Sequence, residues 1–109
     1  MTTITIGKHT NGAYRQLICI GHAGFAKSGS DIVCASVSVL VINTINTLKE
    51  LAGESFETTV NEEDGFIRCD FTTPLQERSV FLLDAMVFGL ENIQKEYGRK
   101  YIQVKFEEV

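Results

Sequence analysis

A histidine and a cysteine are the two side chains of this sequence best suited to covalent chemistry. His22 precedes Cys34 by twelve positions, and the chain from one to the other reads HAGFAKSGSDIVC. A thiolate attacks carbonyl carbons readily, and an imidazole can take the thiol proton and later return it to a leaving amine. The two residues are therefore a candidate Cys/His dyad for acyl transfer.

The patterns on either side predict that these two residues can meet. Residues 13–20 alternate as a strand does, and apolar residues recur at helical spacing over residues 31–52. His22 then follows the strand and Cys34 lies in the first helical turn, so a reversal of the chain brings them close. Free backbone N–H groups of a first turn favour a thiolate, and those near Ala35 and in the preceding turn are expected to hold the oxyanion.

Two polar residues flank the cysteine on one side of the predicted helix. Asp31 lies three positions before Cys34 and Ser38 four positions after it, a spacing that shares one helical face. Asp31 either caps the helix or orients His22, as the third member of a catalytic triad does. Ser38 either supports the site or donates a hydrogen bond to the carbonyl group of Cys34.

The segment between strand and helix is rich in glycine, alanine and serine, a composition typical of a loop that moves. We expect either a lid that orders over a substrate or an ordinary exposed connection. The expected substrate loop comprises Gly21, Ala23, Gly24, Phe25, Lys27, Ser28, Gly29 and Ser30. The helix cap is expected at Ser28, Ser30 or Asp31.

The remaining cysteines and the second histidine have plainer interpretations. Cys19 and Cys69 lie within predicted strands and are expected to pack in the core, and Cys34 could do the same. His9 falls in a predicted hairpin turn and is expected to face solvent. The three cysteines show no CxxC spacing, so neither a disulfide framework nor a metal site is predicted.

The whole chain reads as β-β-α-β-β-α-β. Asn11-Gly12 and Asp64-Gly65 are strong hairpin signals, and each lies between two alternating segments. Pro74 is placed as the first residue of a second helix that ends before Gly98. The predicted strands cover residues 2–7, 13–20, 55–61, 65–72 and 100–108, and the predicted helices cover 31–52 and 74–97.

This order indicates an α+β fold, with a mostly antiparallel sheet and two helices packed on one face. Both helices carry more apolar surface than one sheet face can cover. We therefore expect a homodimer, with a substrate-binding surface as the alternative.

Composition sets further limits. The chain has 109 residues, enough for a single domain over 1–109, and its 44% hydrophobic and 22% charged content is that of an ordinary globular protein. A net charge of −4 argues against direct nucleic-acid binding and favours a basic partner. No signal peptide is evident, and the most apolar run, Ile32–Ile42, has 11 residues where a bilayer span needs roughly 20. No membrane contact and a cytoplasmic location are expected.

The segment GHAGFAKSGSDIVCASVS, residues 21–38, closely resembles the signature of the ribosomal-processing cysteine protease (Prp) family. The resemblance implies an endopeptidase that removes a short N-terminal extension from a large-subunit ribosomal protein, cutting after two aromatic residues and before a small one. Cys34 matches the family's nucleophile and His22 its general base and acid, while Asp31 and Ser38 match further signature positions. It also implies a homodimer with a flexible loop over the site and no cofactor.

Two other functions remain open from the residues. The chain could be a non-enzymatic ribosome-associated or assembly protein that uses a small α+β dimer as a docking platform. It could also be a thiol redox sensor, although no resolving cysteine lies near Cys34 in the sequence.

Overall fold

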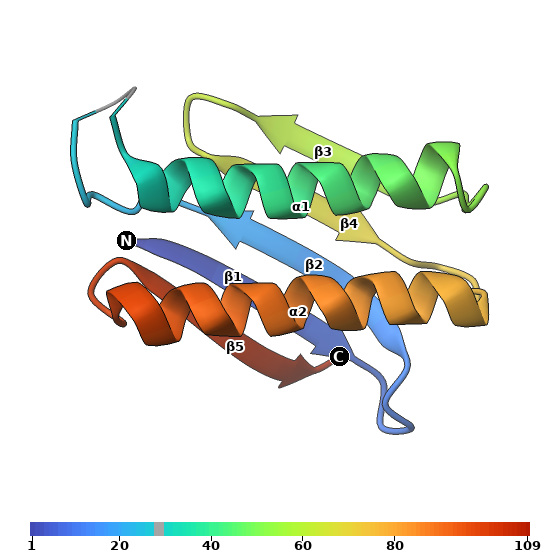
Figure 1. The fold of residues 1–109 in the computed structure, drawn as a ribbon. Coiled ribbons are helices and arrows are strands. Elements are labelled where there is room, and N and C mark those ends of the chain that lie inside the picture. Colours follow the sequence, from blue (N-terminus) through green and yellow to red (C-terminus); the bar gives the residue numbers. More distant parts are fainter. Residues whose placement is uncertain (28–29) are drawn as a thin grey trace.

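The order of elements agrees with the sequence prediction. The structure, a computed structural model, describes residues 1–27 and 30–109. In chain order the elements are β1 (Thr2–Lys8), β2 (Tyr14–Ile20), α1 (Ile32–Glu50), β3 (Glu57–Asn61), β4 (Phe66–Asp70), α2 (Glu77–Tyr97) and β5 (Ile102–Glu108). The two helices lie side by side in front of the sheet (Figure 1).

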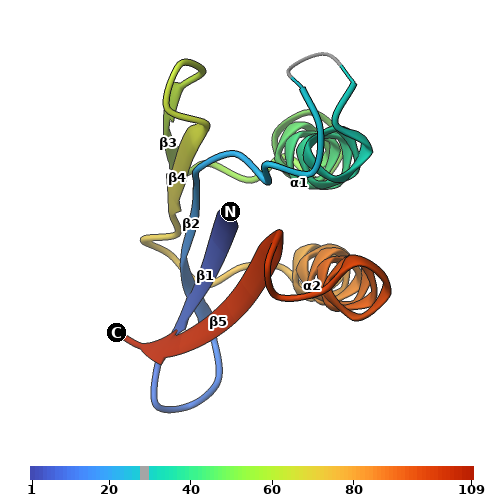
Figure 2. The same cartoon turned by 90° about the vertical axis from the view of Figure 1, so that its left-hand side faces the viewer.

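The five strands form one sheet in the order β3-β4-β2-β1-β5. β1 with β2, β2 with β4 and β3 with β4 pair antiparallel, and β5 joins β1 in parallel. Both helices cover the same face of the sheet, and the other face is left open (Figure 2). The predicted α+β fold with two helices on one face is confirmed. The pairing of β4 with β2 also carries the β3–β4 turn to the end of β2.

The core lies between the sheet and the helices. Alternate residues of the central strands, such as Ile4, Ile6 and Leu17, are almost completely buried beneath the helices. The helices also pack on each other, because Gly89 of α2 leaves room for Leu40 of α1. A Cβ atom at Gly89 would lie 2.7 Å from Leu40 Cδ2.

The second helix begins later than predicted. Pro74 lies outside α2, whose N-cap is Gln76 in an extended conformation. The Gln76 N–H donates to Glu54 Oε2 at 2.9 Å, and its side-chain amide donates to the carbonyl oxygen of Ala52 at 2.8 Å. These bonds tie the segment before α2 to the loop after α1, so the helix starts only at Glu77.

The apolar character of α1 extends further along the helix than the 11-residue run suggests. By length and composition alone, Ile32–Glu50 is long and apolar enough to cross a membrane. The same properties are expected of a helix that packs against a sheet. One side of α1 does so, and its buried residues are Val33, Val37, Val41, Thr44, Ile45 and Leu48.

Candidate active site

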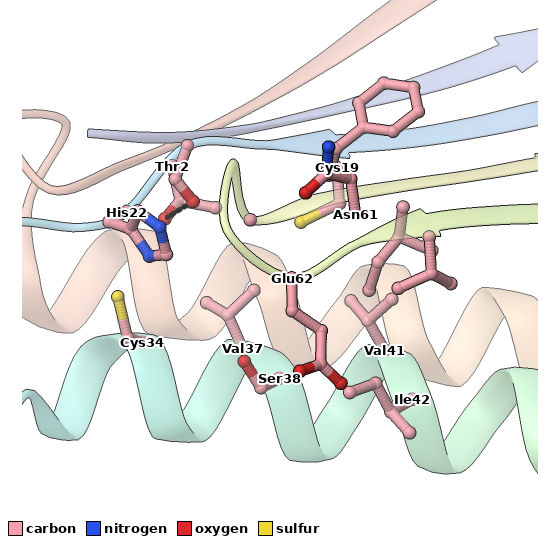
Figure 3. Close-up of a pocket in the computed structure, with 15 residues that line it drawn as sticks. Thr2, Cys19, His22, Cys34, Val37, Ser38, Val41, Ile42, Asn61 and Glu62 are labelled. Carbon is pink, nitrogen blue, oxygen red and sulfur yellow. Dashed lines mark hydrogen bonds between the residues drawn. The ribbon is translucent and has the colours of Figure 1, made fainter. Parts of the chain in front are cut away.

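Cys34 lies in the first turn of α1, where the sequence places it, and its side chain is half-buried. Its sulfur points toward the imidazole of His22 (Figure 3). The backbone N–H of Ala23 donates to Cys34 Sγ at 3.0 Å. A donor directed at the sulfur stabilises negative charge there, which is what a thiolate nucleophile requires.

Asp31 joins the start of α1 to the preceding loop. Its Oδ1 accepts from the N–H of Cys34 at 2.9 Å, so it is the N-cap of the helix. Its Oδ2 accepts from the N–H groups of Phe25 at 3.0 Å and Ala26 at 3.4 Å. The capping interpretation is therefore the one the geometry shows, and no hydrogen bond joins Asp31 to His22 within the described residues.

The Asp31 carboxyl is buried, and burial acts to raise its pKa. The hydrogen bonds that it accepts, three from these backbone N–H groups and one from the Cys34 thiol, outweigh burial and hold the pKa below its ordinary value. Asp31 is therefore a carboxylate at neutral pH, as its capping role requires.

His22 lies just beyond β2 and is exposed. Its Nε2 lies 3.2 Å from the carbonyl oxygen of Glu63, in the turn between β3 and β4. The neighbouring Gly21 N–H donates to the carbonyl oxygen of Asp64 at 3.2 Å. The histidine is thus held by a turn about 40 residues away in sequence, and it lies with Cys34 at one end of the sheet.

Cys34 and His22 lie between two hollows of the surface. One has a volume of about 290 Å³ and runs between α1 and the β3–β4 hairpin, with apolar walls that include Val37, Val41, Ile42 and Val60. The other has a volume of about 450 Å³ and is bounded mainly by small residues, Gly24, Ala26 and Ala35 among them. His22, Cys34 and Ser38 line both. An extended peptide could therefore cross the sulfur with one hollow on each side.

Ser38 is exposed toward these hollows (Figure 3). Within the described residues its hydroxyl makes no hydrogen bond, so the expected side-chain bond to the carbonyl group of Cys34 is not formed there. The expectation for Ala35 also needs correction. Its N–H donates to the carbonyl oxygen of Asp31 at 3.0 Å as part of the helix, and it is not free to hold an oxyanion.

Parts of the loop are better packed than its composition predicts. Ala23 is buried, with 2% of its surface exposed. The ring of Phe25 packs edge-on against Tyr97 and Tyr101, with centroid distances of 5.5 and 5.1 Å. The Ser30 N–H donates to the Lys27 carbonyl oxygen at 2.9 Å. Among the other predicted loop residues, Gly21 and Gly24 have positive φ angles, and Ser28 and Gly29 lie outside the described residues.

The other two thiols are poor nucleophiles. Cys19 and Cys69 are buried in the core, as predicted. Burial raises the pKa of the Cys19 thiol to about 11, and burial likewise raises that of Cys69. His9 pairs with Arg15 Nη1 at 2.7 Å, and the described residues contain no cluster of three metal-ligating side chains.

Several residues at the site carry no signal in the sequence. The wall formed by Val60, Asn61 and Glu62 comes from the β3–β4 hairpin, which the sequence predicts as a hairpin but does not place at the site. Only the strand order shows that this turn lies beside His22.

We predict selective alkylation of Cys34 in the folded chain. A pKa of about 11 leaves Cys19 with a thiolate population about 100-fold below that of an ordinary thiol, and the core also shields it. Iodoacetamide followed by peptide mapping should modify Cys34 at least about 10-fold faster than the other two thiols. Equal rates in the folded chain would contradict the site, and denaturant should abolish the selectivity.

We predict that Asp31→Ala lowers the free energy of unfolding by about 1 kcal/mol, within roughly 0.5–2, because the N-cap is lost. Asp31→Asn keeps a capping oxygen and should cost less. The pKa of Asp31 is lower in the folded chain than the unfolded value of about 3.9. The charge of Asp31 therefore stabilises the fold fully above about pH 3.9, and this stabilisation is lost as the pH falls through the pKa of the folded chain. Urea unfolding at pH 7 and pH 3 measures this, and an unchanged midpoint for Asp31→Ala at pH 7 would refute it.

Comparison with known proteins now adds to this geometry. The family model of the cysteine protease Prp matches residues 1–103. The ribosomal processing cysteine protease Prp of Bacillus subtilis (strain 168) is 32% identical over 81 residues, covering 71% of this chain and 72% of the relative. The protein of the same name from Staphylococcus aureus (strain Mu50) is 26% identical over 98 residues, covering 90% and 92%.

Solved structures have the same fold. The ribosomal processing protease Prp from S. aureus, in complex with a covalently linked product peptide, superposes with a TM-score of 0.92 at 24% identity, covering 98% of this chain and 100% of that one. A Streptococcus mutans protein superposes with a TM-score of 0.85 at 27% identity, covering 100% and 96%. The resemblance seen in residues 21–38 is confirmed, and the chain belongs to the cysteine protease Prp family.

Proposed function

We propose that this protein removes the short N-terminal extension of a large-subunit ribosomal protein, using Cys34 as nucleophile and His22 as general base and acid. The observation that carries the proposal is the half-buried thiol between two hollows, with an N–H group on its sulfur and an imidazole beside it. Two relatives are named for ribosomal processing. Prp from S. aureus has been crystallised with a substrate peptide.

The chemistry is acyl transfer in two stages. His22 takes the proton of the Cys34 thiol, and the sulfur attacks the scissile carbonyl carbon to form a tetrahedral oxyanion. Collapse of that intermediate breaks the C–N bond as His22 gives its proton to the leaving amine. Water, deprotonated by the same imidazole, then hydrolyses the thioester and restores the thiol. This cycle is complete without a cofactor.

The Ala23 N–H is the donor we assign to the developing oxyanion. It already points at the sulfur, and so lies beside the carbon that the sulfur attacks. It is fixed there because Ala23 is buried and the following loop residues are bonded to Asp31. When the sulfur attacks and loses its negative charge, this N–H can pass from the sulfur to the oxyanion, whose charge it then stabilises.

The two hollows differ in the residues that line them, and this difference suits a substrate with aromatic residues before the cut and a small residue after it. The hollow along α1 has apolar walls that suit aromatic side chains, and the hollow beside Gly24 and Ala35 is bounded by small residues. We assign the residues before the cut to the first and those after it to the second. The net charge of −4 also favours a basic ribosomal substrate and disfavours direct contact with nucleic acid.

The alternative function, a thiol redox sensor, has less support than the protease. The structure brings Cys19 to the same hollow as Cys34, which sequence spacing does not show. Its pKa of about 11 makes it a slow resolving thiol, however. The other rival, a non-enzymatic assembly protein, does not explain why an N–H group is directed at the sulfur beside a histidine. The three free cysteines suit a reducing compartment, so we place the activity in the cytoplasm.

Cleavage of an extended ribosomal precursor tests the proposal. The purified chain should remove the extension, and mass spectrometry should show one cut. Cys34→Ser and His22→Ala should lower kcat at least about 1,000-fold, because the nucleophile or its base is lost. Ser36→Ala, on an exposed position of the same helix, is the matched control and should cut like the wild type. An uncut precursor with the wild type, or full cutting by Cys34→Ser, would refute the mechanism.

We also propose a homodimer formed through the outer faces of the helices. Val39 of α1 and Phe81 and Phe88 of α2 are 68%, 74% and 69% exposed. Phe81 and Phe88 are seven residues apart on α2 and so share one face. These faces point away from the sheet (Figure 2), where a second copy could cover them.

Charge placed on this surface should separate the subunits. We expect the wild type to sediment as a dimer and Phe81→Glu/Phe88→Glu as a monomer, because burying two carboxylates in an apolar interface is unfavourable. Phe106→Glu is the control, since Phe106 is 54% exposed on β5, an edge strand of the sheet, and belongs to neither helix. Analytical ultracentrifugation measures the mass. A wild type that is monomeric at all concentrations contradicts the dimer, and a dimer that survives Phe81→Glu/Phe88→Glu contradicts this interface.

A further inference from the structure

The turn between β3 and β4 contacts both the proposed base and the residue before it. His22 Nε2 lies 3.2 Å from the carbonyl oxygen of Glu63, and the Gly21 N–H donates to the carbonyl oxygen of Asp64 at 3.2 Å. Both bonds are made by main-chain groups of the turn, so the turn's conformation decides whether they form.

The bond to Glu63 fixes where the histidine carries its proton. A carbonyl oxygen can only accept a hydrogen bond, so Nε2 of His22 must carry the hydrogen. In a neutral imidazole the other nitrogen, Nδ1, is then unprotonated. Nδ1 is therefore the nitrogen available to take the proton of Cys34, whose sulfur faces the ring (Figure 3). The opposite tautomer would leave Nδ1 protonated and unable to act as the base.

The side chain of Asn61 holds the turn in this shape. Its Oδ1 accepts from the N–H groups of Glu63 at 3.1 Å and Asp64 at 3.4 Å. Its Nδ2 donates to Asp64 Oδ2 at 3.1 Å. Asparagine stabilises turns in this way, by bonding to the backbone a few residues ahead. The two residues whose carbonyl groups meet Gly21 and His22 are the two that Asn61 binds.

Gly65 completes the arrangement by having no side chain. Its φ of +61° suits glycine, and a Cβ atom there would lie 2.6 Å from the Gly21 carbonyl oxygen and 3.2 Å from His22 Cε1. Any other residue would push the histidine segment away from the turn. The turn and the end of β2 are thus closely fitted over the residues that the chemistry uses.

We propose that the turn Asn61–Gly65 sets the tautomer and position of His22, with Asn61 as a positioning residue for the protease reaction. The inference deepens the proposed function, because it takes His22 as the general base. Asn61 also lines the apolar hollow (Figure 3), so its effect on the base must be separated from an effect on substrate binding.

Nitrogen-15 NMR of the His22 imidazole in the resting enzyme is the first test. We expect hydrogen on Nε2 in the wild type, and in Asn61→Ala a shift of population toward the tautomer with hydrogen on Nδ1. Thr59→Ala, on an exposed β3 position, is the matched control and should keep the wild-type signals. A wild type with hydrogen on Nδ1 overturns the inference even if Asn61→Ala does not fold. This readout needs no activity, so it stands apart from any failure of the proposed function.

Steady-state kinetics on the precursor peptide is the second test. Asn61→Ala should lower kcat about 10-fold, the effect of losing roughly one hydrogen bond to the base. The double change Asn61→Asp/Asp64→Asn keeps the accepting oxygen and reverses the side-chain pair, so it should recover most of kcat. A folded Asn61→Ala with unchanged kcat and tautomer, or a loss confined to KM, overturns the positioning role.

Discussion

The site depends on the hydrogen bonds that the Asp31 carboxylate accepts. It caps α1 through the N–H of Cys34 and binds the loop through the N–H groups of Phe25 and Ala26. A loop of small residues has little apolar surface with which to hold itself in place. One buried carboxylate therefore fixes the helix start and the loop together. This leaves the Ala23 N–H directed at the sulfur.

His22, the proposed base, is held by a separate part of the molecule. β4 pairs with β2, and this pairing brings the β3–β4 turn to the end of β2, next to His22. The proposed nucleophile and base are thus fixed by different elements, Cys34 by the helix cap and His22 by a hairpin. Each support also forms part of the wall of one hollow, Asp31 of the hollow beside Gly24 and the hairpin of the hollow along α1, so both hollows meet at the sulfur.

Local signals in the sequence predicted most of the fold and the meeting of His22 with Cys34 at one end of the sheet. Asn11-Gly12 and Asp64-Gly65 marked both hairpins, and helical periodicity marked both helices. The start of α2 was misplaced at Pro74 because hydrogen bonds from the loop after α1 delay the helix. The packing of Phe25 and the contact of the β3–β4 turn with His22 depend on residues distant in sequence, so no local pattern reports them. The dual role of Asp31 likewise needed the loop's path, since spacing alone allowed a cap or a triad member.

The most direct test of the account is to trap the covalent intermediate. The chain is mixed with an ester analogue of the precursor peptide, quenched in acid within the first turnover and mapped by mass spectrometry. We predict one acyl group per chain, attached as a thioester to Cys34. An acyl group attached to another residue would contradict this mechanism. So would turnover of the ester without any acyl-enzyme, measured with the ester in excess and deacylation slow.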